Sequence, residues 1–229
     1  MVAIQDGGWR EQVRSLLRLG GPLIVNNLAV AGMQFADAVM AGRLGADALA
    51  AVAVGGSVWF LGFSFCLGLL MAISPIAARH FGAGDKALIG RYTRQGIYLG
   101  LCMGALLILL GQFAVAPMLV AIGIDPEFRD LTVGYVGAIM FGGPGIFIFL
   151  ALRFTTEGVG HTRPIMFTSL FALVCNVFLN YVLMFGKFGA PALGVLGCGL
   201  ASAITMWLVA AALAGHMFFS RFYRAFAIF

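Results

Sequence analysis

The chain has 229 residues, of which 62% are hydrophobic and only 10% are charged, and its formal net charge is +5. Soluble domains carry about 25% charged residues, so this composition excludes a soluble protein and predicts an all-α polytopic membrane protein. A transmembrane barrel is disfavoured because the apolar runs do not alternate and far exceed the roughly ten residues of a barrel strand.

Six apolar runs are long enough for helices that cross a membrane, which requires about 20 residues. We predict these spans at about residues 18–42, 49–76, 94–116, 131–153, 164–186 and 194–218. Residues 1–17 are expected to form an amphipathic segment at the cytoplasmic interface. After the six-helix unit of residues 18–220, residues 221–229 are expected to begin a linker.

The basic residues are unevenly divided between the two sets of connecting segments. With the N-terminus inside, the cytoplasmic segments hold eleven Lys or Arg residues and the outer segments hold three. The eleven are Arg10, Arg14, Arg18, Arg79, Lys86, Arg91, Arg94, Arg153, Arg163, Arg221 and Arg224, and the three are Arg43, Arg129 and Lys187. This bias predicts that both termini are cytoplasmic. The positive charge therefore indicates orientation, and no nucleic-acid partner is expected.

Asp37 is the only carboxylate in the long apolar run from Leu19 to Ala41. A charged side chain at bilayer depth costs at least about 2.5 kcal/mol, so it needs a partner, a proton or a cation. We therefore predict that Asp37 belongs to an ion or proton site. The chain lacks the G-x-x-x-x-G-K-[ST] motif of ATP-driven proteins, and the combination points to ion-coupled transport.

Glycine is frequent within the predicted spans. Gly96, Gly100 and Gly104 repeat every four residues, which favours close helix packing in lipid. The cluster at residues 142–145 (GGPG) interrupts the fourth span and is either a tightly packed kink or a hinge beside a cavity. Residues 79–91 are expected to form a basic cytoplasmic loop with glycine breaks.

Three further polar residues are predicted at a depth similar to that of Asp37. At 1.5 Å per residue, Asp37 lies roughly 27 Å along the first span, and Asn176 and Asn180 lie roughly 18 and 24 Å along the fifth. The sixth span runs inward, which places Ser202 roughly 10 Å below the outer surface. Asn176 and Asn180 are four residues apart and therefore share one helix face.

This set of oxygen-bearing side chains suits two kinds of site. Together with the Asp37 carboxylate it can form an oxygen shell for Na⁺, or it can surround a protonated Asp37, because removal from water disfavours the charged form. A structural alternative is that the three neutral side chains only bond helices together. Gln34 could line the same cavity or serve as a packing amide. Asn26 and Asn27 are weaker candidates for an inward-facing substrate path.

Four ordered motifs resemble the multidrug and toxic compound extrusion (MATE) family. Residues 37–45 (DAVMAGRLG), followed by ALAA, are similar to its first-helix signature, and residues 157–164 (EGVGHTRP) resemble its loop between helices 4 and 5. Residues 176–181 (NVFLNY) and 194–202 (GVLGCGLAS) resemble helices 5 and 6 of the NorM-like branch. The resemblance extends across nearly the whole chain.

The resemblance implies an antiporter in a bacterial inner membrane that exports organic cations or drugs in exchange for Na⁺ or H⁺. It implies that Asp37, Asn176 and Asn180 form the cation or proton site of the amino-terminal lobe. Ser202 stands where the family often has threonine. Some relatives carry aspartate at the position of Asn180, so a two-acid proton relay is in doubt here. No cofactor is implied beyond the coupling ion.

Members of the family have twelve helices in two lobes, with the substrate cavity between them, and this chain matches only the first lobe. We therefore expect it to be inactive alone. Besides membrane lipids and small organic cations, its implied partner is a carboxy-terminal lobe or a second copy, and residues 221–229 then begin the linker between lobes.

Other functions fit the residues less well. A flippase for lipid-linked oligosaccharides shares the wider superfamily, but the spans lack the interior Lys or Arg that such proteins use to hold phosphate. An inactive membrane module is a second alternative. An enzyme is not expected, because Ser64 lies mid-membrane whereas His216 lies near the cytoplasmic face, and a nucleophile and its base must meet.

Overall fold

A computed structural model describes residues 9–121, 123 and 125–228. Within these ranges the chain forms ten helices and no strand. The helices are α1 (Trp9–Leu44), α2 (Ala46–Met71), α3 (Ile73–Ala83), α4 (Lys86–Phe113), α5 (Val115–Ala121), α6 (Pro126–Met140), α7 (Gly143–Gly158), α8 (Arg163–Phe185), α9 (Gly194–Phe219) and α10 (Arg221–Arg224).

The helices account for six membrane spans. Five stretches of the described chain are long and apolar enough to cross a membrane, and α2 and α3 together form one of them, Ala46–Ala83. The sixth is a broken span in which Phe128–Met140 and Gly143–Gly158 are bent by 45°. The predicted all-α fold with six membrane helices is confirmed, with the fourth span divided between α6 and α7.

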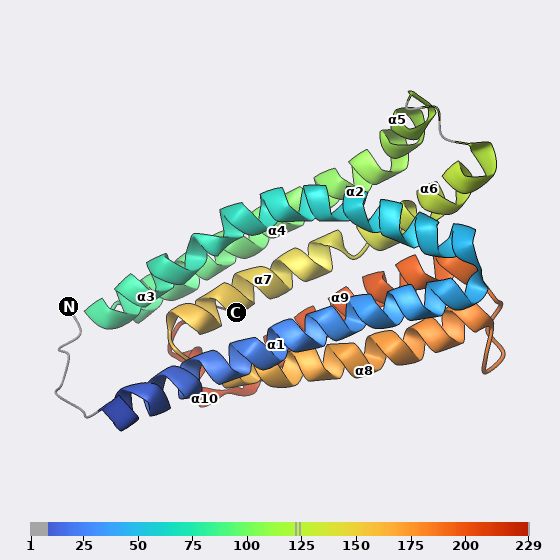
Figure 1. The fold of residues 1–229 in the computed structure, drawn as a ribbon. Helices are drawn as coiled ribbons and strands as arrows, with labels where there is room; N and C mark the ends of the chain where they lie inside the picture. The colour runs from blue at the N-terminus through green and yellow to red at the C-terminus, as the bar shows by residue number, and fades with distance from the viewer. Residues whose placement is uncertain (1–8, 122, 124, 229) are drawn as a thin grey trace.

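The spans are arranged around α7 and α9 (Figure 1). α8 packs against both α1 and α9, while α7 packs against α4 on one side and α9 on the other. α1 and α2 meet at the end where Gly45 joins them, and they diverge toward the opposite end of the molecule. Gly45 has a φ of 131°, a conformation that glycine adopts without a steric penalty.

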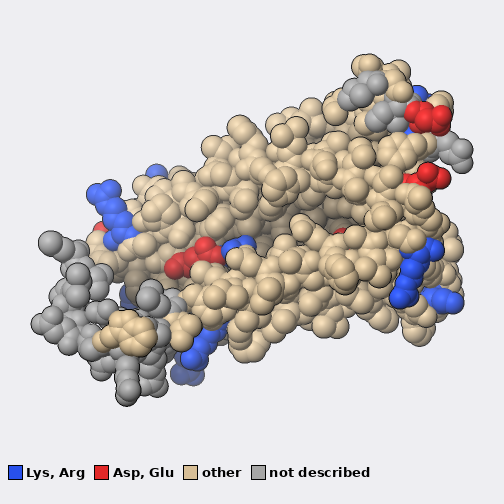
Figure 2. Space-filling view, viewed as in Figure 1, with Lys and Arg blue, Asp and Glu red and all other residues tan. Residues whose placement is uncertain are grey.

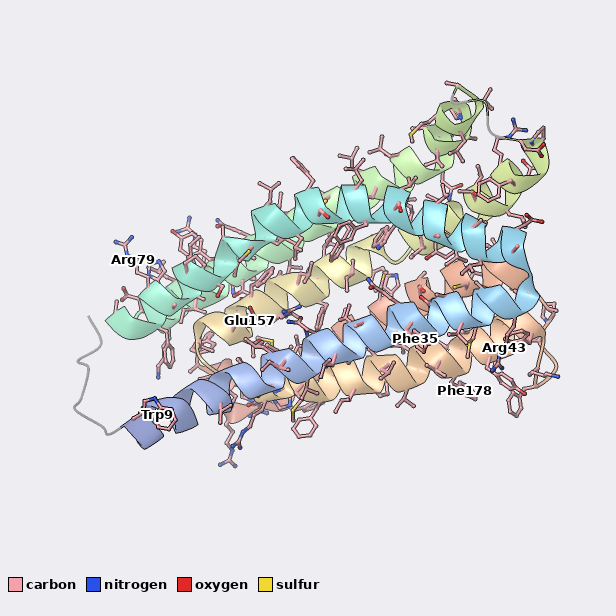
Figure 3. The ribbon with its side chains drawn as sticks, in the orientation of Figure 1. Trp9, Phe35, Arg43, Arg79, Glu157 and Phe178 are labelled. Carbon is pink, nitrogen blue, oxygen red and sulfur yellow. The ribbon has the colours of Figure 1, made fainter. Side chains whose placement is uncertain are left out.

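Charged side chains gather toward the two ends of the molecule, and the surface between them is largely uncharged (Figure 2). Arg79 marks one end and Arg43 marks the other (Figure 3). Connections that the charge pattern assigns to the cytoplasm lie at the first end, and those assigned to the outside lie at the second. Which end faces the cytoplasm stays a prediction from the distribution of basic residues.

The expected cytoplasmic loop at residues 79–91 is wrong, because most of it is helical. α3 continues to Ala83 and α4 begins at Lys86, so only Gly84 and Asp85 connect the two helices. Gly84 has a φ of 80° and donates its N–H to the carbonyl of Phe81, which ends α3 tightly. Glycine at this point therefore closes a short turn between two long helices.

The N-terminal helix also begins before the first predicted span. α1 is continuous from Trp9 to Leu44, so the described part of the expected amphipathic segment belongs to the same helix as the first span. Residues 1–8 lie outside the described residues, and the interfacial role of this segment stays a prediction.

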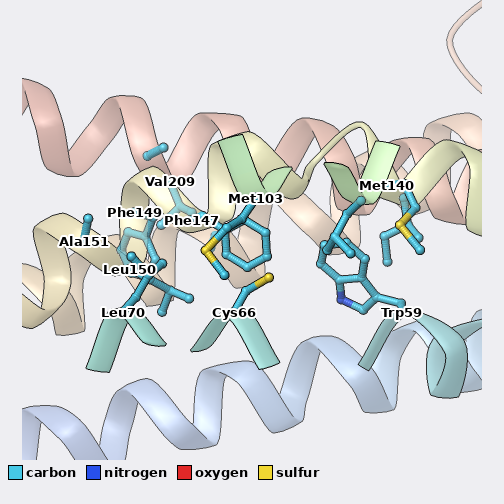
Figure 4. Close-up of a cluster of buried hydrophobic side chains, with 14 of the residues drawn as sticks. Trp59, Cys66, Leu70, Met103, Met140, Phe147, Phe149, Leu150, Ala151 and Val209 are labelled. Carbon is cyan, nitrogen blue, oxygen red and sulfur yellow. The ribbon is translucent and has the colours of Figure 1, made fainter. Parts of the chain in front are cut away.

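Large side chains from α2, α4 and α7 form the core of the lobe (Figure 4). Leu70, Phe147 and Ala151 are completely buried, and Trp59 and Met103 are nearly so. In lipid, burial gains little from the hydrophobic effect, so the cohesion of this core rests on close van der Waals contact. A tightly packed interior is therefore what fixes the angles between helices.

The glycine stripe of α4 lies directly against α7, as the four-residue repeat predicts. A Cβ atom at Gly100 would lie 2.9 Å from the Cβ of Phe147, and one at Gly104 would lie 2.4 Å from the backbone nitrogen of Pro144. These distances are shorter than carbon and nitrogen atoms tolerate. The prediction of close helix contact is confirmed, and α7 approaches α4 backbone to backbone.

The break at residues 142–145 is closely packed from the opposite side as well. A Cβ atom at Gly142 would lie 2.8 Å from the Cα of Ala203 on α9. The indole nitrogen of Trp207, also on α9, donates to the carbonyl of Phe141 at 3.0 Å, which satisfies a backbone acceptor at the end of α6. Of the two alternatives for this cluster, the geometry is that of a packed kink.

Candidate functional site

The Asp37 carboxylate meets the amide of Asn180 between α1 and α8. Asn180 donates from Nδ2 to Asp37 Oδ1 at 2.5 Å, and from the same nitrogen to Asn176 Oδ1 at 3.2 Å. An amide nitrogen has two hydrogens, so these two bonds use its full donor capacity. The structure therefore brings three of the four principal candidates into one hydrogen-bonded chain.

The amide oxygen of Asn180 has no such partner. Asn180 is completely buried, and its Oδ1 makes no hydrogen bond with any described residue. A buried acceptor without a partner costs about 1–3 kcal/mol, so its presence calls for an explanation. The atom lies on the same amide group that binds Asp37, which makes it an available oxygen ligand beside a carboxylate.

Ser202 completes the predicted set from α9. The Ser202 hydroxyl and the Asn176 amide both face the Asp37 carboxylate within the range of polar interactions. Ser202 is 7% exposed and Asn176 is 2% exposed, whereas Asp37 itself is only partly buried. The carboxylate thus reaches from the open side of α1 into a buried polar cluster. The assignment of these residues to a cation or proton site stays a prediction.

Close helix contacts bring α9 and α6 to this cluster. A Cβ atom at Gly197 would lie 2.6 Å from the carbonyl oxygen of Leu183 on α8, and one at Gly199 would lie 2.6 Å from the carbonyl oxygen of Tyr135 on α6. α9 can approach both neighbours this closely because it carries no side chain at either position. Ser202 follows Gly199 by one turn and is positioned by the same contacts.

Sequence reasoning missed two residues beside the site. Tyr135 on α6 and Cys198 on α9 are buried and lie within electrostatic range of the Asp37 carboxylate. Tyr135 could have been found, since it is a polar residue in the predicted outer part of the fourth span, and Asp37 is predicted in the outer half of the first span. Cys198 gave no such signal, because buried cysteine is an ordinary packing residue.

The weaker candidates are separated from the hydrogen-bonded cluster. Asn26 is buried and donates to Asn27 Oδ1 at 3.3 Å, while Asn27 and Gln34 are exposed on α1. Among the described residues, neither Gln34 nor this pair makes a hydrogen bond to Asp37. Their part in a substrate pathway stays a prediction.

Figure 3 shows where the cluster lies along the molecule. Phe35 marks its position on α1 and Phe178 marks it on α8, both in the half that ends at Arg43. The fold and this site define a class of protein: a helical, multi-pass membrane protein with a carboxylate–amide cluster between its first and fifth spans.

Comparison with known proteins identifies the family. A family model described as MatE matches residues 22–182, so the chain belongs to the MatE family. The resemblance drawn from the four motifs is therefore confirmed.

Relatives of known sequence agree with this assignment. The chain is 37% identical over 219 residues to "Probable multidrug resistance protein NorM" of Shewanella oneidensis, covering 95% of the chain and 47% of the relative. It is 41% identical over 201 residues to "Multidrug resistance protein MdtK" of Edwardsiella ictaluri, covering 88% and 44% respectively. The chain thus spans about half the length of the relatives that it matches.

Solved structures share the fold. A eukaryotic MATE transporter, AtDTX14, matches with a TM-score of 0.87 and 24% identity over 96% of this chain and 48% of that one. An outward-facing multidrug resistance MATE family transporter matches with a TM-score of 0.82 and 21% identity over 90% of this chain and 45% of that one. The chain has the fold of one six-helix lobe of a MATE-type protein.

Proposed function

We propose that the chain is the amino-terminal lobe of a cation-coupled antiporter that exports organic cations or drugs. In this proposal, Asp37, Asn176, Asn180 and Ser202 bind the coupling ion, which is Na⁺ or H⁺. Both termini face the cytoplasm of a bacterial cell, and the protein lies in the inner membrane.

The unpartnered oxygen of Asn180 is the observation that carries the site. Its amide nitrogen already binds Asp37, so its oxygen has to be satisfied by a group other than the described side chains. A hard cation or an added proton on the carboxylate would supply that partner. Either one would also neutralise a carboxylate held within a membrane span, which is costly when left charged.

The available donors fit a sodium ion by their chemistry. Carboxylate, amide carbonyl and hydroxyl oxygens are the ligands that hard cations prefer, and all three kinds converge here. A proton fits the same arrangement differently. A protonated Asp37 would be a hydrogen-bond donor, and the unpartnered Asn180 Oδ1 and the Ser202 oxygen are acceptors that could receive its proton.

The proposed substrates come from the names of the relatives. Two of them are called multidrug resistance proteins, and the chain covers less than half of each. Substrate export is therefore proposed for a complete protein that contains a second lobe, because alternating access moves one repeat against the other around a shared cavity. The lobe described here would supply the ion site.

Ion binding can be tested on the 229-residue chain without any transport assay. Purified chain in detergent micelles is heated in NaCl or in choline chloride at equal ionic strength. A sodium site predicts a higher unfolding midpoint in NaCl, because a ligand at 100 times its Kd stabilises the folded state by about 2.7 kcal/mol. A proton site predicts instead an infrared band of a protonated carboxyl group that disappears as pH rises.

Asp37→Asn should remove whichever signal is present. Asp47→Asn is the matched control, because Asp47 is an exposed acid at the start of α2, outside the cluster. The proposal is wrong if Asp37→Asn and Asp47→Asn behave alike in both measurements.

A further inference from the structure

The chain folds back on itself after α9. Residues 221–228 comprise α10 and the segment that follows it, and their larger apolar side chains face inward. Tyr223, Phe226 and Ile228 are only 2%, 1% and 4% exposed. These residues are buried like core residues, although their sequence suggests a linker.

One anchor of this segment is the first part of α4. A Cβ atom at Gly90 would lie 1.8 Å from the carbonyl oxygen of Phe226, so the two backbones touch at a point where only glycine fits. One turn further along α4, the guanidinium of Arg94 donates to the carbonyl of Ala227. Ala227 has a φ of 48°, a left-handed conformation that alanine adopts only when its surroundings favour it.

Aromatic rings anchor the segment to three other elements. The ring of Phe81 on α3 lies 6.2 Å from that of Phe222. His161, in the connection between α7 and α8, stacks on Phe222 with ring centroids 4.6 Å apart. His216 on α9 meets the ring of Tyr223 edge-on at 6.1 Å. Pairs at such distances contribute beyond the area they bury.

The anchors lie on both sides of α7. α7 packs against α3 and α4 on one side and against α9 on the other, and the segment passes from α9 to α4 at the end of the molecule that also holds the start of α1 (Figure 1). It therefore bridges helices that α7 separates.

We propose that residues 221–228 are a strap that ties α3 and α4 to α9, so that this end of the lobe moves as one body. Residues 221–228 are then part of the lobe and do not serve as flexible linker. If the proposed alternating-access function holds, the strap keeps the shape of the lobe constant while the lobe moves as a whole. The strap itself is independent of ion binding and of substrate.

Trypsin provides a direct test, because Arg221 and Arg224 are exposed cleavage sites within the strap. Protease cleavage of a folded segment follows the population of its open form. The 229-residue chain in detergent micelles is digested briefly, and cleavage at these two sites is followed by mass spectrometry. A synthetic peptide of residues 215–229 gives the rate for an undocked segment. We expect the chain to be cleaved at least about tenfold more slowly than the peptide.

Two glycine variants distinguish release of the strap from a general loosening of the helices at this end. Gly90→Ala places a Cβ atom against the Phe226 carbonyl, and it should restore cleavage to nearly the rate of the peptide. Gly82→Ala is the matched control, because Gly82 is a helical glycine at the same end with no described atom within 4 Å of its added Cβ. It should leave the protection unchanged.

Arg94→Ala serves as a second variant in case Gly90→Ala does not fold. It removes the bond from a partly buried side chain to the Ala227 carbonyl and should raise cleavage by a smaller factor. Cleavage of the unaltered chain at the rate of the peptide would overturn the proposal. Full protection in both Gly90→Ala and Arg94→Ala would overturn it too. Because no transport or ion binding is measured, this result is separate from the test of the coupling-ion site.

Discussion

Asn180 and Asp37 are 143 residues apart in the chain, and the amide nitrogen of one donates to a carboxylate oxygen of the other. This single contact joins α8 to α1 within the membrane and uses the only carboxylate of the first span. It also turns the amide so that its oxygen is left without a described partner. Each neutral residue of the cluster makes different hydrogen bonds, so substitutions at these residues should reduce ion affinity by different, measurable amounts.

Asn180→Ala should weaken ion binding more than Asn176→Ala. The first change removes both the donor to Asp37 and the free oxygen, whereas the second leaves the Asn180–Asp37 bond and that oxygen in place and removes an acceptor for Asn180 and an amide that faces Asp37. We expect a loss in affinity of at least about tenfold for Asn180→Ala, equivalent to about 1.4 kcal/mol. The ion-dependent shift of the unfolding midpoint measures it.

Ser169→Ala provides the control for this comparison. Ser169 is a buried polar residue on the same helix, but its hydroxyl bonds to the carbonyl of Met166 within that helix. Its loss should not change ion affinity. Equal effects of Asn176→Ala and Asn180→Ala would show that the two amides do not have the different roles that their hydrogen bonds indicate.

Gly104→Ala should destabilise the lobe. The added methyl group would lie 2.4 Å from the backbone nitrogen of Pro144, so α4 and α7 would have to separate. Overpacking of this kind costs about 1–3 kcal/mol. Gly68→Ala on the exposed face of α2 is the control, since no described atom lies within 4 Å of its added Cβ. Tryptophan fluorescence during heating gives the unfolding midpoint of each variant. A midpoint for Gly104→Ala above that of the unaltered chain would contradict the close packing at this kink.

Arg153 and Glu157 should behave as a coupled pair. Their side chains are 20% and 17% exposed, and Arg153 Nε lies 2.7 Å from Glu157 Oε1 one turn along α7. Glu157 is labelled in Figure 3. Removing one partner leaves the other group without its hydrogen bond in a poorly solvated place, so Arg153→Met alone should cost about 1–3 kcal/mol. The double variant Arg153→Met/Glu157→Met should recover most of that loss. Additive losses in thermal unfolding would mean that the pair is not coupled.

Reporter fusions can test the orientation that the basic residues predict. A fusion at residue 86 should report the cytoplasm and one at residue 125 should report the outside, because positive residues are retained on the cytoplasmic side. These two positions lie at opposite ends of the molecule. The reverse pattern would invert the assignment of every connection, including the strap.

The chain alone should not catalyse ion-driven export. Only 11% of the residues in the most apolar stretch of its first span are buried within the lobe, so much of this span faces away from the other helices. A substrate cavity between two repeats needs both. Purified chain in liposomes should therefore show little gradient-driven efflux of a cationic dye, with NorM of Shewanella oneidensis reconstituted in parallel for comparison. Strong, gradient-dependent efflux from verified monomers would contradict the requirement for a second lobe.

Some features of this protein follow from the residues alone. The apolar runs predict the spans because crossing a bilayer demands about 20 uncharged residues, whatever the helices pack against. Asp37 is singled out by the cost of a charge at that depth, and the glycine repeat of α4 predicts a close contact without naming the partner. Each is a local property of one helix and its solvent.

Other features depend on how separate helices meet, and only the tertiary structure decides them. The orientation of the Asn180 amide depends on α1, α8 and α9 together, and depth along a helix does not determine rotation about it. The 45° bend between α6 and α7, two helices that pack against α4 and α9, is likewise a property of the assembled helices. The burial of Tyr223 and Phe226 could not be predicted, because Gly90 and Arg94, which contact this segment, lie more than a hundred residues earlier in the chain. Contacts between such distant residues leave no periodic signal in the sequence, so they appear only when the chain is folded.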